Sequence, residues 1–349
     1  MITRESGPVA GVLAGADLGG LLTGNGAGAH HVLTAEQLPA DVLPATWQGR
    51  AVTGLHVKRH GCPPARQAAL VAALAGVAAA PALRAVPSQV VGEHVVSLHL
   101  GDTVDLGRVL GQAHGTVVSR VHGACLASLT AFAGRDDELR AFIGERTAYA
   151  APVFPVLERY RRALGLAAEV LGGVDLPSEL PWPSSPRRIL FCDPKPANFL
   201  DHPDAGREGD PEPVRIDLDL MHWECELSLQ IVLVLFAHPV RANGVTTPAA
   251  RFDVLRAQAR EVGAGLGIGG QEMDSMILYH LLRNFTSAAV DGDRAKARAM
   301  APVFRRAVET IAPAAPGHRT RRLLTDWMAA HDGGSGTSHL DGTEAGPWR

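Results

Sequence analysis

The pattern of apolar positions changes near residue 105 of the chain. Before that point the apolar runs are short and broken by glycine, which predicts strands separated by turns. These runs cover residues 11–24, 30–38, 51–60 and 87–101. Between them, Pro63 and Pro64 precede an alanine- and leucine-rich segment at 65–80, which predicts a helix with proline in its first turn.

After residue 105 the apolar positions recur three and four residues apart, as on one face of a helix. The predicted helical segments lie at 106–132, 136–171, 227–237, 250–263, 272–289 and 293–311. A proline-rich connector at 176–186 precedes three short strand-like runs, at 187–193, 197–202 and 214–220. The whole pattern predicts an α+β fold, in which a small antiparallel sheet with one helix precedes a larger, mainly helical part.

The length of 349 residues exceeds the size at which a single hydrophobic core usually stops growing. We therefore expect two lobes, an N-terminal lobe at 1–100 and a C-terminal helical lobe at 101–330. Residues 331–349 are rich in glycine, serine and charge and have little to bury, which predicts a disordered tail.

The composition argues against several classes of protein. Hydrophobic residues make up 46% and charged residues 20%, with a formal net charge of −3 and no long basic run, so we expect no nucleic-acid partner. No signal-peptide pattern and no run of apolar residues long enough to span a bilayer occurs, which predicts a cytoplasmic protein with no membrane partner.

The sequence contains no H-E-x-x-H pair and no G-x-x-x-x-G-K-[ST] loop. The four cysteines lack a C-x-x-C spacing, and we expect them to be reduced thiols.

The stretch Phe191–Asn198, F-C-D-P-K-P-A-N, carries the chemistry that stands out, together with Asp217 in V-R-I-D-L-D-L. Phosphoryl transfer needs a carboxylate to orient the attacking hydroxyl and hard oxygen ligands for Mg²⁺. Asp193 on a loop supplies the first, and the Asn198 amide with the Asp217 carboxylate supplies the second. Lys195 is placed to offset the charge of the transferred group.

D-P-K-P-A-N with a later I-D resembles the catalytic loop and metal-binding aspartate of eukaryotic-like kinases, most closely the aminoglycoside phosphotransferase and choline kinase group. The resemblance extends over about residues 15 to 315 and implies a bilobal protein-kinase-like fold, with ATP or GTP as phosphoryl donor between the lobes. It implies Asp193 as catalytic base and Asn198 and Asp217 as Mg²⁺ ligands. Asp219 is either a further ligand or a solvated acid.

The same resemblance implies where the nucleotide binds. Lys58, one of only three lysines in the sequence, ends a strand-like run where this kinase group has its phosphate-binding lysine. Ser97 and His99 lie where the backbone of the kinase hinge receives the base. Gly24, Gly26 and Gly28 form either a phosphate-binding loop or a plain turn.

Three positions depart from the pattern of this kinase group. Residues 59–92 contain no acid, so the glutamate that normally pairs with the kinase lysine is absent, and Gln67 cannot replace its charge. Phe191 and Cys192 replace the usual His-Gly before the catalytic aspartate. Glu226 stands where the group has an aspartate that supports the loop.

The acceptor is left open by the sequence. Acids and aromatic residues of the helical part are candidates for holding it: Trp223, Glu224, Glu226, Tyr279, Asp291 and Asp293. Because this part is not conspicuously acidic, a sugar or nucleoside is as acceptable as an aminoglycoside. The alanine, glycine and arginine bias is typical of GC-rich bacteria, in which such kinases often confer antibiotic resistance or self-resistance.

Three functions therefore remain for the chain. The first is an active small-molecule O-phosphotransferase acting on a hydroxyl of an antibiotic-like or other metabolite. The second is a kinase-fold binding protein with weak catalysis, a pseudokinase, which the departures favour. The third is a protein kinase, against which stands the absence of an A-P-E-like segment after Asp217. The oligomeric state is not predicted.

Overall fold

The structure of the chain is a computed structural model. It describes residues 30–38, 43–47, 49–59, 69, 86, 88–101, 103–105, 123, 126–127, 129, 135–146, 153–179, 185–189, 199–201, 214–215, 223–236, 248–312 and 317–331. The chain separates into two compact units. Unit 1 comprises residues 1–109, 120–153 and 188–224, and unit 2 comprises residues 110–119, 154–187 and 225–349.

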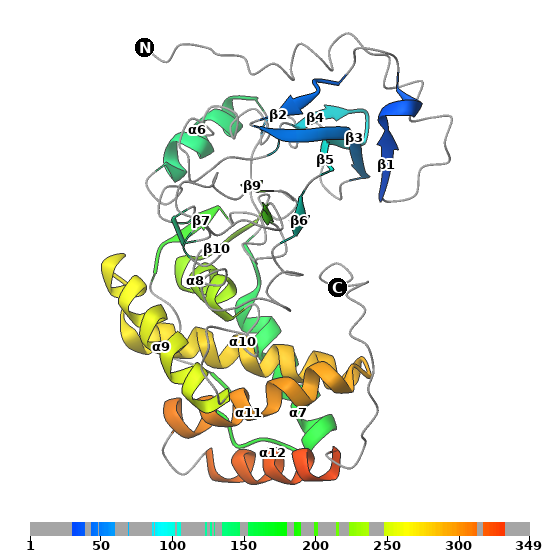
Figure 1. Cartoon of the computed structure of the whole chain (residues 1–349). Coiled ribbons are helices and arrows are strands. Elements are labelled where there is room, and N and C mark those ends of the chain that lie inside the picture. The colour runs from blue at the N-terminus through cyan, green and yellow to red at the C-terminus, as the bar shows by residue number, and fades with distance from the viewer. Residues whose placement is uncertain are drawn as a thin grey trace. The chain divides into compact units, whose positions relative to one another are not determined.

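Unit 1 contains a five-stranded antiparallel sheet (Figure 1). Its strands are β1 (His30–Thr34), β2 (Thr46–Trp47), β3 (Arg50–Arg59), β4 (Ser88–Val91) and β5 (His94–Leu100), with a 3₁₀ turn at Ala35–Gln37 after β1. The order is β1-β3-β5-β4, and β2 pairs with the start of β3. The longest strand, β3, therefore lies between β1 and β5.

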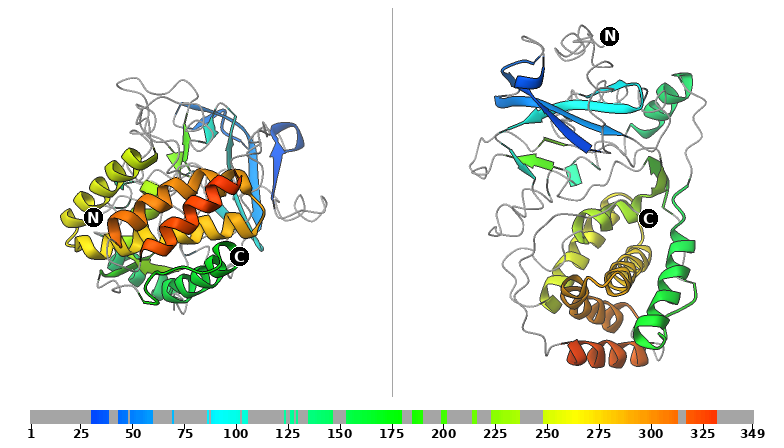
Figure 2. Two further views of the ribbon diagram at one scale, coloured as in Figure 1. Left: turned by 90° about the horizontal axis from the view of Figure 1, so that it is seen from below. Right: turned by 90° about the vertical axis from the view of Figure 1, so that its right-hand side faces the viewer.

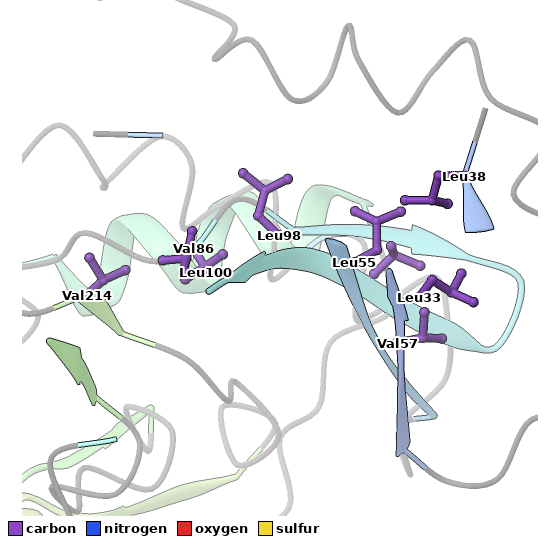
Figure 3. Close-up of a cluster of buried hydrophobic side chains, with 9 residues drawn as sticks. Leu33, Leu38, Leu55, Val57, Val86, Leu98, Leu100 and Val214 are labelled. Atoms are coloured by element: carbon purple, nitrogen blue, oxygen red, sulfur yellow. The ribbon is translucent and has the colours of Figure 1, made fainter. Parts of the chain in front are cut away.

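One face of this sheet packs into the core of unit 1. Leu55 and Val57 are fully buried on β3, and their cross-strand partners Leu98 and Val96 are 3% and 1% exposed. This alternation follows from the period of two in a strand. The cluster is drawn in Figure 3 and contains Leu33, Leu38, Leu55, Val57, Val86, Val96, Leu98, Leu100 and Val214.

A glycine permits the close approach of β1 and β3. Gly54 pairs with Thr34, and a Cβ atom at position 54 would collide with the carbonyl oxygen of Leu33. Only a residue without a side chain fits this contact.

Two smaller sheets contain the strands that come before and after the predicted catalytic segment in the sequence. The first consists of β6 (Val104–Asp105), β8 (Phe199–Asp201) and β9 (Val214–Arg215), in the order β6-β8-β9. The second pairs β7 (Arg187–Ile189) with β10 (Glu224–Glu226). Unit 1 also contains the helix α6 (Asp136–Arg146).

Unit 2 is helical. Its helices are α7 (Val156–Leu171), α8 (Leu227–Phe236), α9 (Pro248–Gly265), α10 (Gly270–Val290), α11 (Arg294–Ile311) and α12 (Gly317–His331). The central helix is α10, which packs against α7, α8, α9 and α11, while α11 also packs against α12 (Figure 2). Every residue of α8 is buried, as expected for a helix that is apolar on all sides.

Aromatic side chains join three of these helices. The ring of Phe285 on α10 lies 5.7 Å from that of Phe304 on α11 and 5.2 Å, edge to face, from that of Trp327 on α12. These centroid distances are in the range of favourable aromatic pairs. The contacts bury the apolar face of α12 against the rest of unit 2.

The predicted α+β class is confirmed, with the small antiparallel sheet first and the mainly helical part later. The segment 136–171 is not one helix but two, because Pro155 stands at the N-terminus of α7 and cannot continue a preceding helix. Helix α12 was not predicted. The predicted strand 11–24, helix 65–80 and helix 106–132 lie outside the described residues, apart from isolated positions. The predicted tail, 331–349, also lies outside them, except for His331, which is the last residue of α12 and not part of a tail. The lobe boundaries at 100 and 330 stay predictions.

None of the helices in the described ranges is both long and apolar enough to cross a membrane.

Candidate functional site

The candidate catalytic loop lies between two strands that the structure describes. Strand β7 ends at Ile189, before Asp193 and Lys195, and β8 begins at Phe199, directly after Asn198. Asp217 and Asp219 follow the end of β9. The five predicted residues themselves lie outside the described residues, so their placement is constrained only through these strands.

The pairing of β8 with β9 places the start of one strand beside the end of the other. The strands are antiparallel, with Phe199 opposite Arg215 and Leu200 opposite Val214. The start of β8 and the end of β9 are therefore at the same end of the ladder, and opposing Cα atoms in such a ladder are about 4.5–5.5 Å apart. Asn198 is one residue before Phe199, and Asp217 is two residues after Arg215.

Lys58 lies on the face of the β1-β3-β5-β4 sheet that is opposite the core. Its neighbours on β3, Leu55 and Val57, are fully buried, whereas His56 and Lys58 are half-buried. Lys58 is opposite His30 on β1 and Val95 on β5. The ammonium group is thus carried by the less apolar side of the sheet, where a charged side chain can interact with a ligand.

Ser97 and His99 share this face with Lys58. Ser97 is opposite His56, and His99 is opposite Gly54, so that both project to the same side as Lys58. The Nδ1 atom of His99 is 3.0 Å from the hydroxyl of Thr53. The structure therefore brings three predicted nucleotide-binding residues together on one sheet face, while Gly24, Gly26 and Gly28 lie outside the described residues.

Glu224 is engaged in an ion pair. Its Oε1 atom accepts a hydrogen bond of 2.8 Å from Nε of Arg140 on α6, and the two side chains are 19% and 30% exposed. A substrate cation at Glu224 would have to compete with this guanidinium. Trp223, the residue before it, is half-buried.

Glu226 is buried, with 7% of its surface exposed. Its Oε1 atom accepts from Nε of Arg187 at 3.3 Å, and its Oε2 atom has no hydrogen-bond partner among the described residues. A buried carboxylate oxygen without a partner costs free energy. Glu226 thus retains an acceptor that a further donor can use.

Three other candidates have positions that define their roles. Tyr279 on α10 is 1% exposed, so its ring cannot stack on a ligand from solvent. Burial raises the pKa of its hydroxyl, against the opposing charges of Arg283 and Arg159. Asp293 is the N-cap of α11 and accepts from the Lys296 backbone N–H at 3.0 Å, and Asp291 is the C-cap of α10.

No group of three or more histidine, cysteine or acidic side chains suited to a metal ion occurs within the ranges that the structure describes. Cys225 is fully buried and forms no disulfide within these ranges. The predicted ligands Asn198, Asp217 and Asp219 lie outside these ranges.

No family model matches this chain. No curated protein matches it. One similar solved structure is the crystal structure of a choline/ethanolamine kinase family protein from Mesorhizobium loti, with 12% sequence identity and a TM-score of 0.37 over 91% of this chain and 97% of that chain. A likeness of this size carries no argument about activity, so the function is argued from the residues of this chain.

The ion pair of Arg140 with Glu224 was not predicted from the sequence. The two residues are 84 positions apart, and neither lies in a motif that would indicate the contact. The sequence offered only a weak indication of this contact. An arginine that is half-buried on a helix implies an acidic partner somewhere in the fold, but it does not say which one.

Proposed function

We propose that this protein is a small-molecule O-kinase of the aminoglycoside phosphotransferase and choline kinase type, with a bilobal protein-kinase-like fold. The nucleotide-binding lobe is residues 1–100, the catalytic and substrate-binding lobe is residues 101–330, and residues 331–349 form a tail. It transfers the γ-phosphoryl group of ATP or GTP to a hydroxyl of an aminoglycoside, nucleoside, sugar or other metabolite. A role in antibiotic resistance or self-resistance belongs to the same proposal.

The observation that carries the proposal is the β8–β9 ladder. It supports an arrangement in which Asn198 and Asp217 leave the same end of two neighbouring strands. An amide oxygen and a carboxylate oxygen at this end are the donor set that Mg²⁺ prefers, and Asp219 can add a third oxygen. Mg²⁺ held by these residues would supply positive charge that neutralises the phosphates of the nucleotide.

The remaining residues have defined tasks in the transfer. Asp193 orients the acceptor hydroxyl and takes its proton as the oxygen attacks the γ-phosphorus atom, while the bond from that phosphorus to the bridging oxygen breaks. Lys195 offsets the charge on the transferred group. On the polar face of the sheet, Lys58 binds the phosphates, and Ser97 and His99 lie near the base. Glu224, Glu226 and Trp223 are proposed to lie near the acceptor.

The test is the substitution of the catalytic base. Asp193→Ala should lower turnover by about 10² to 10⁴ and leave nucleotide affinity nearly unchanged, because the carboxylate acts on the acceptor and not on the nucleotide. Turnover is measured as phosphate transfer to a panel of hydroxylated acceptors, with Asp193→Asn as the conservative companion. Wild-type turnover in Asp193→Ala would refute the assignment.

The second candidate function is a nucleotide-binding protein with weak catalysis. It is favoured by the lack of acids from Arg59 to Gly92, and by the use of the next acid, Glu93, in a 2.7 Å ion pair with Arg59. This candidate predicts nucleotide binding without acceptor phosphorylation, and the same acceptor panel separates the two.

A further inference from the structure

A β-bulge interrupts the pairing of β3 with β5 at Thr53. Val52 is opposite Leu100, and Gly54 is opposite His99. Two steps along β3 therefore correspond to one step along β5, and Thr53 is the extra residue. Regular alternation from Gly54 would place the Thr53 side chain on the core side of the sheet. A bulge can turn a side chain away from the direction that alternation gives it.

The Thr53 side chain is in fact exposed, and it contacts the end of β5. Its Oγ1 atom lies 3.0 Å from Nδ1 of His99. It also lies against the backbone of Gly101, where a Cβ atom would collide with Cγ2 and Oγ1 of Thr53. The arrangement therefore depends on the residue types at three positions, a threonine at the bulge, a histidine beside it and a glycine after β5.

The contact with Thr53 determines which ring nitrogen of His99 is left for a ligand. Nδ1 is engaged by the Thr53 hydroxyl, whereas Nε2 makes no hydrogen bond within the ranges that the structure describes. When one ring nitrogen of a histidine is hydrogen-bonded, that bond sets the protonation and the orientation of the other. His99 is half-buried, so its ring is held at one nitrogen and retains the other for binding.

The sheet face that carries His99 indicates the class of ligand. His56 and Lys58 share this face on β3, and Ser97 shares it on β5. None of the described strand residues whose register places them on this face is an acid. A lysine with hydrogen-bonding side chains and no acid among them suits an anion that also carries hydrogen-bonding atoms. A nucleotide has both.

The spacing along β3 agrees with such a ligand. Gly54, the residue opposite His99, lies four residues before Lys58. At the rise of a β-strand this separation is about 13 Å. It is comparable with the distance between the base and the outer phosphates of an extended nucleoside triphosphate. With the phosphates at Lys58, the base therefore comes near His99.

We propose that Thr53 is a positioning residue for nucleotide binding, which holds the His99 ring so that Nε2 forms a hydrogen bond with the nucleobase. This inference rests on the proposed function for the identity of the ligand. The coupling of Thr53 to the His99 ring does not depend on it, since both residues belong to the same bulged strand pair.

The first experiment is calorimetric binding to the full chain of MgATP, MgGTP and magnesium tripolyphosphate, which has no base. His99→Ala should weaken binding of the preferred nucleotide roughly fivefold, the factor that one hydrogen bond contributes. Thr53→Val should weaken it roughly threefold, and Thr53→Ser, which keeps the hydroxyl, should restore the affinity. Affinity for tripolyphosphate should stay at the wild-type value in all three variants.

His94 provides the matched control. It is also a half-buried histidine of β5, but it is opposite Arg59 and lies on the other face of the sheet. His94→Ala should bind the nucleotide as the wild type does. Unchanged nucleotide affinity in His99→Ala, an equal loss in His94→Ala, or an equal loss for tripolyphosphate would overturn the contact with the base.

The second experiment is ¹⁵N NMR of the histidine ring nitrogens in the ligand-free protein. Thr53→Val should shift the Nδ1 resonance of His99 and leave those of His94 in place, and Thr53→Ser should return it. An unshifted resonance would overturn the coupling. If the wild type binds neither nucleotide, the proposed function fails, and the NMR data still decide the coupling. If the wild type binds a nucleotide and His99→Ala binds it equally well, the inference fails while the proposed function stands.

Discussion

His280 is a neutral histidine inside unit 2, and its removal should change the response of the protein to acid. It lies on α10 and is 3% exposed, with Nε2 at 3.2 Å from the carbonyl oxygen of Phe236 and 2.8 Å from Nδ2 of Asn284. Its Nδ1 atom has no hydrogen-bond partner among the described residues. Burial and the charges of Arg283 and Lys296 lower the pKa of His280 from 6.5 to about 3, against a raising effect of the Phe236 carbonyl.

The sign of the effect follows from this lowered pKa. Below pH 6.5 His280 is protonated in the unfolded chain, whereas in the folded chain it stays neutral until the pH approaches 3. Acid therefore favours the unfolded state, and the histidine lowers the free energy of unfolding by about 1.4 kcal/mol for each pH unit between these limits. Two pH units below 6.5, the cost is about 2.7 kcal/mol. Above 6.5 the group has no effect on the pH dependence.

The assay is urea unfolding followed by far-UV circular dichroism, at about pH 7.5 and about pH 4.5. The quantity compared is the difference between the two pH values, so the stability of each variant cancels. His280→Gln should lose about 2–3 kcal/mol less on acidification than the wild type, because glutamine does not titrate. His318→Gln, at an exposed position of α12, should behave as the wild type. Equal acid losses in the wild type and in His280→Gln would refute the reasoning.

Two further substitutions test contacts within unit 2. Asp175 accepts hydrogen bonds from the backbone N–H groups of Arg319 and Thr320 at the start of α12, at 2.9 and 2.7 Å, so Asp175→Ala should cost about 1–2 kcal/mol at neutral pH by urea unfolding. Burial raises the pKa of this carboxyl, but the hydrogen bonds outweigh it and hold the pKa below 3.8, so the cost should shrink as the pH falls through this lowered value. A cost that does not change in acid would contradict this account. Asp274→Ala should cost roughly 3 kcal/mol, because it leaves the guanidinium groups of Arg256 and Arg260 facing each other without their carboxylate. A urea midpoint equal to that of the wild type would show that the ion pairs of Asp274 with Arg256 and Arg260 do not stabilise the fold.

The alternation of apolar and polar residues was sufficient to predict much of the fold. It located β4 and β5 within 87–101, and it predicted a strand-like run at 51–60, where the structure has β3 at Arg50–Arg59. Helix α12 was missed because its apolar contacts are few and its first turn carries several arginines. Besides its aromatic contacts, the start of α12 is held by a carboxylate about 145 residues earlier, at Asp175, and local periodicity contains no information on that contact.

The candidate site also has a part that the sequence predicts and a part that it does not. The residues of the catalytic stretch are contiguous, so their types and spacing were enough to suggest phosphoryl transfer. The contacts of Glu224 with Arg140 and of Thr53 with His99 join positions 84 and 46 residues apart. Such pairs depend on tertiary packing, and a single sequence has no period or motif that would reveal them.

The central claim is a Mg²⁺-dependent nucleotide site that includes Asp217. The most direct test is calorimetric binding of ATP and of GTP, with and without Mg²⁺, to the wild type and to Asp217→Asn. The account predicts binding that requires Mg²⁺ and that Asp217→Asn abolishes, since the substitution removes a charged metal ligand and keeps its shape. Absence of nucleotide binding in the wild type, or binding that is the same in Asp217→Asn with and without Mg²⁺, would contradict it.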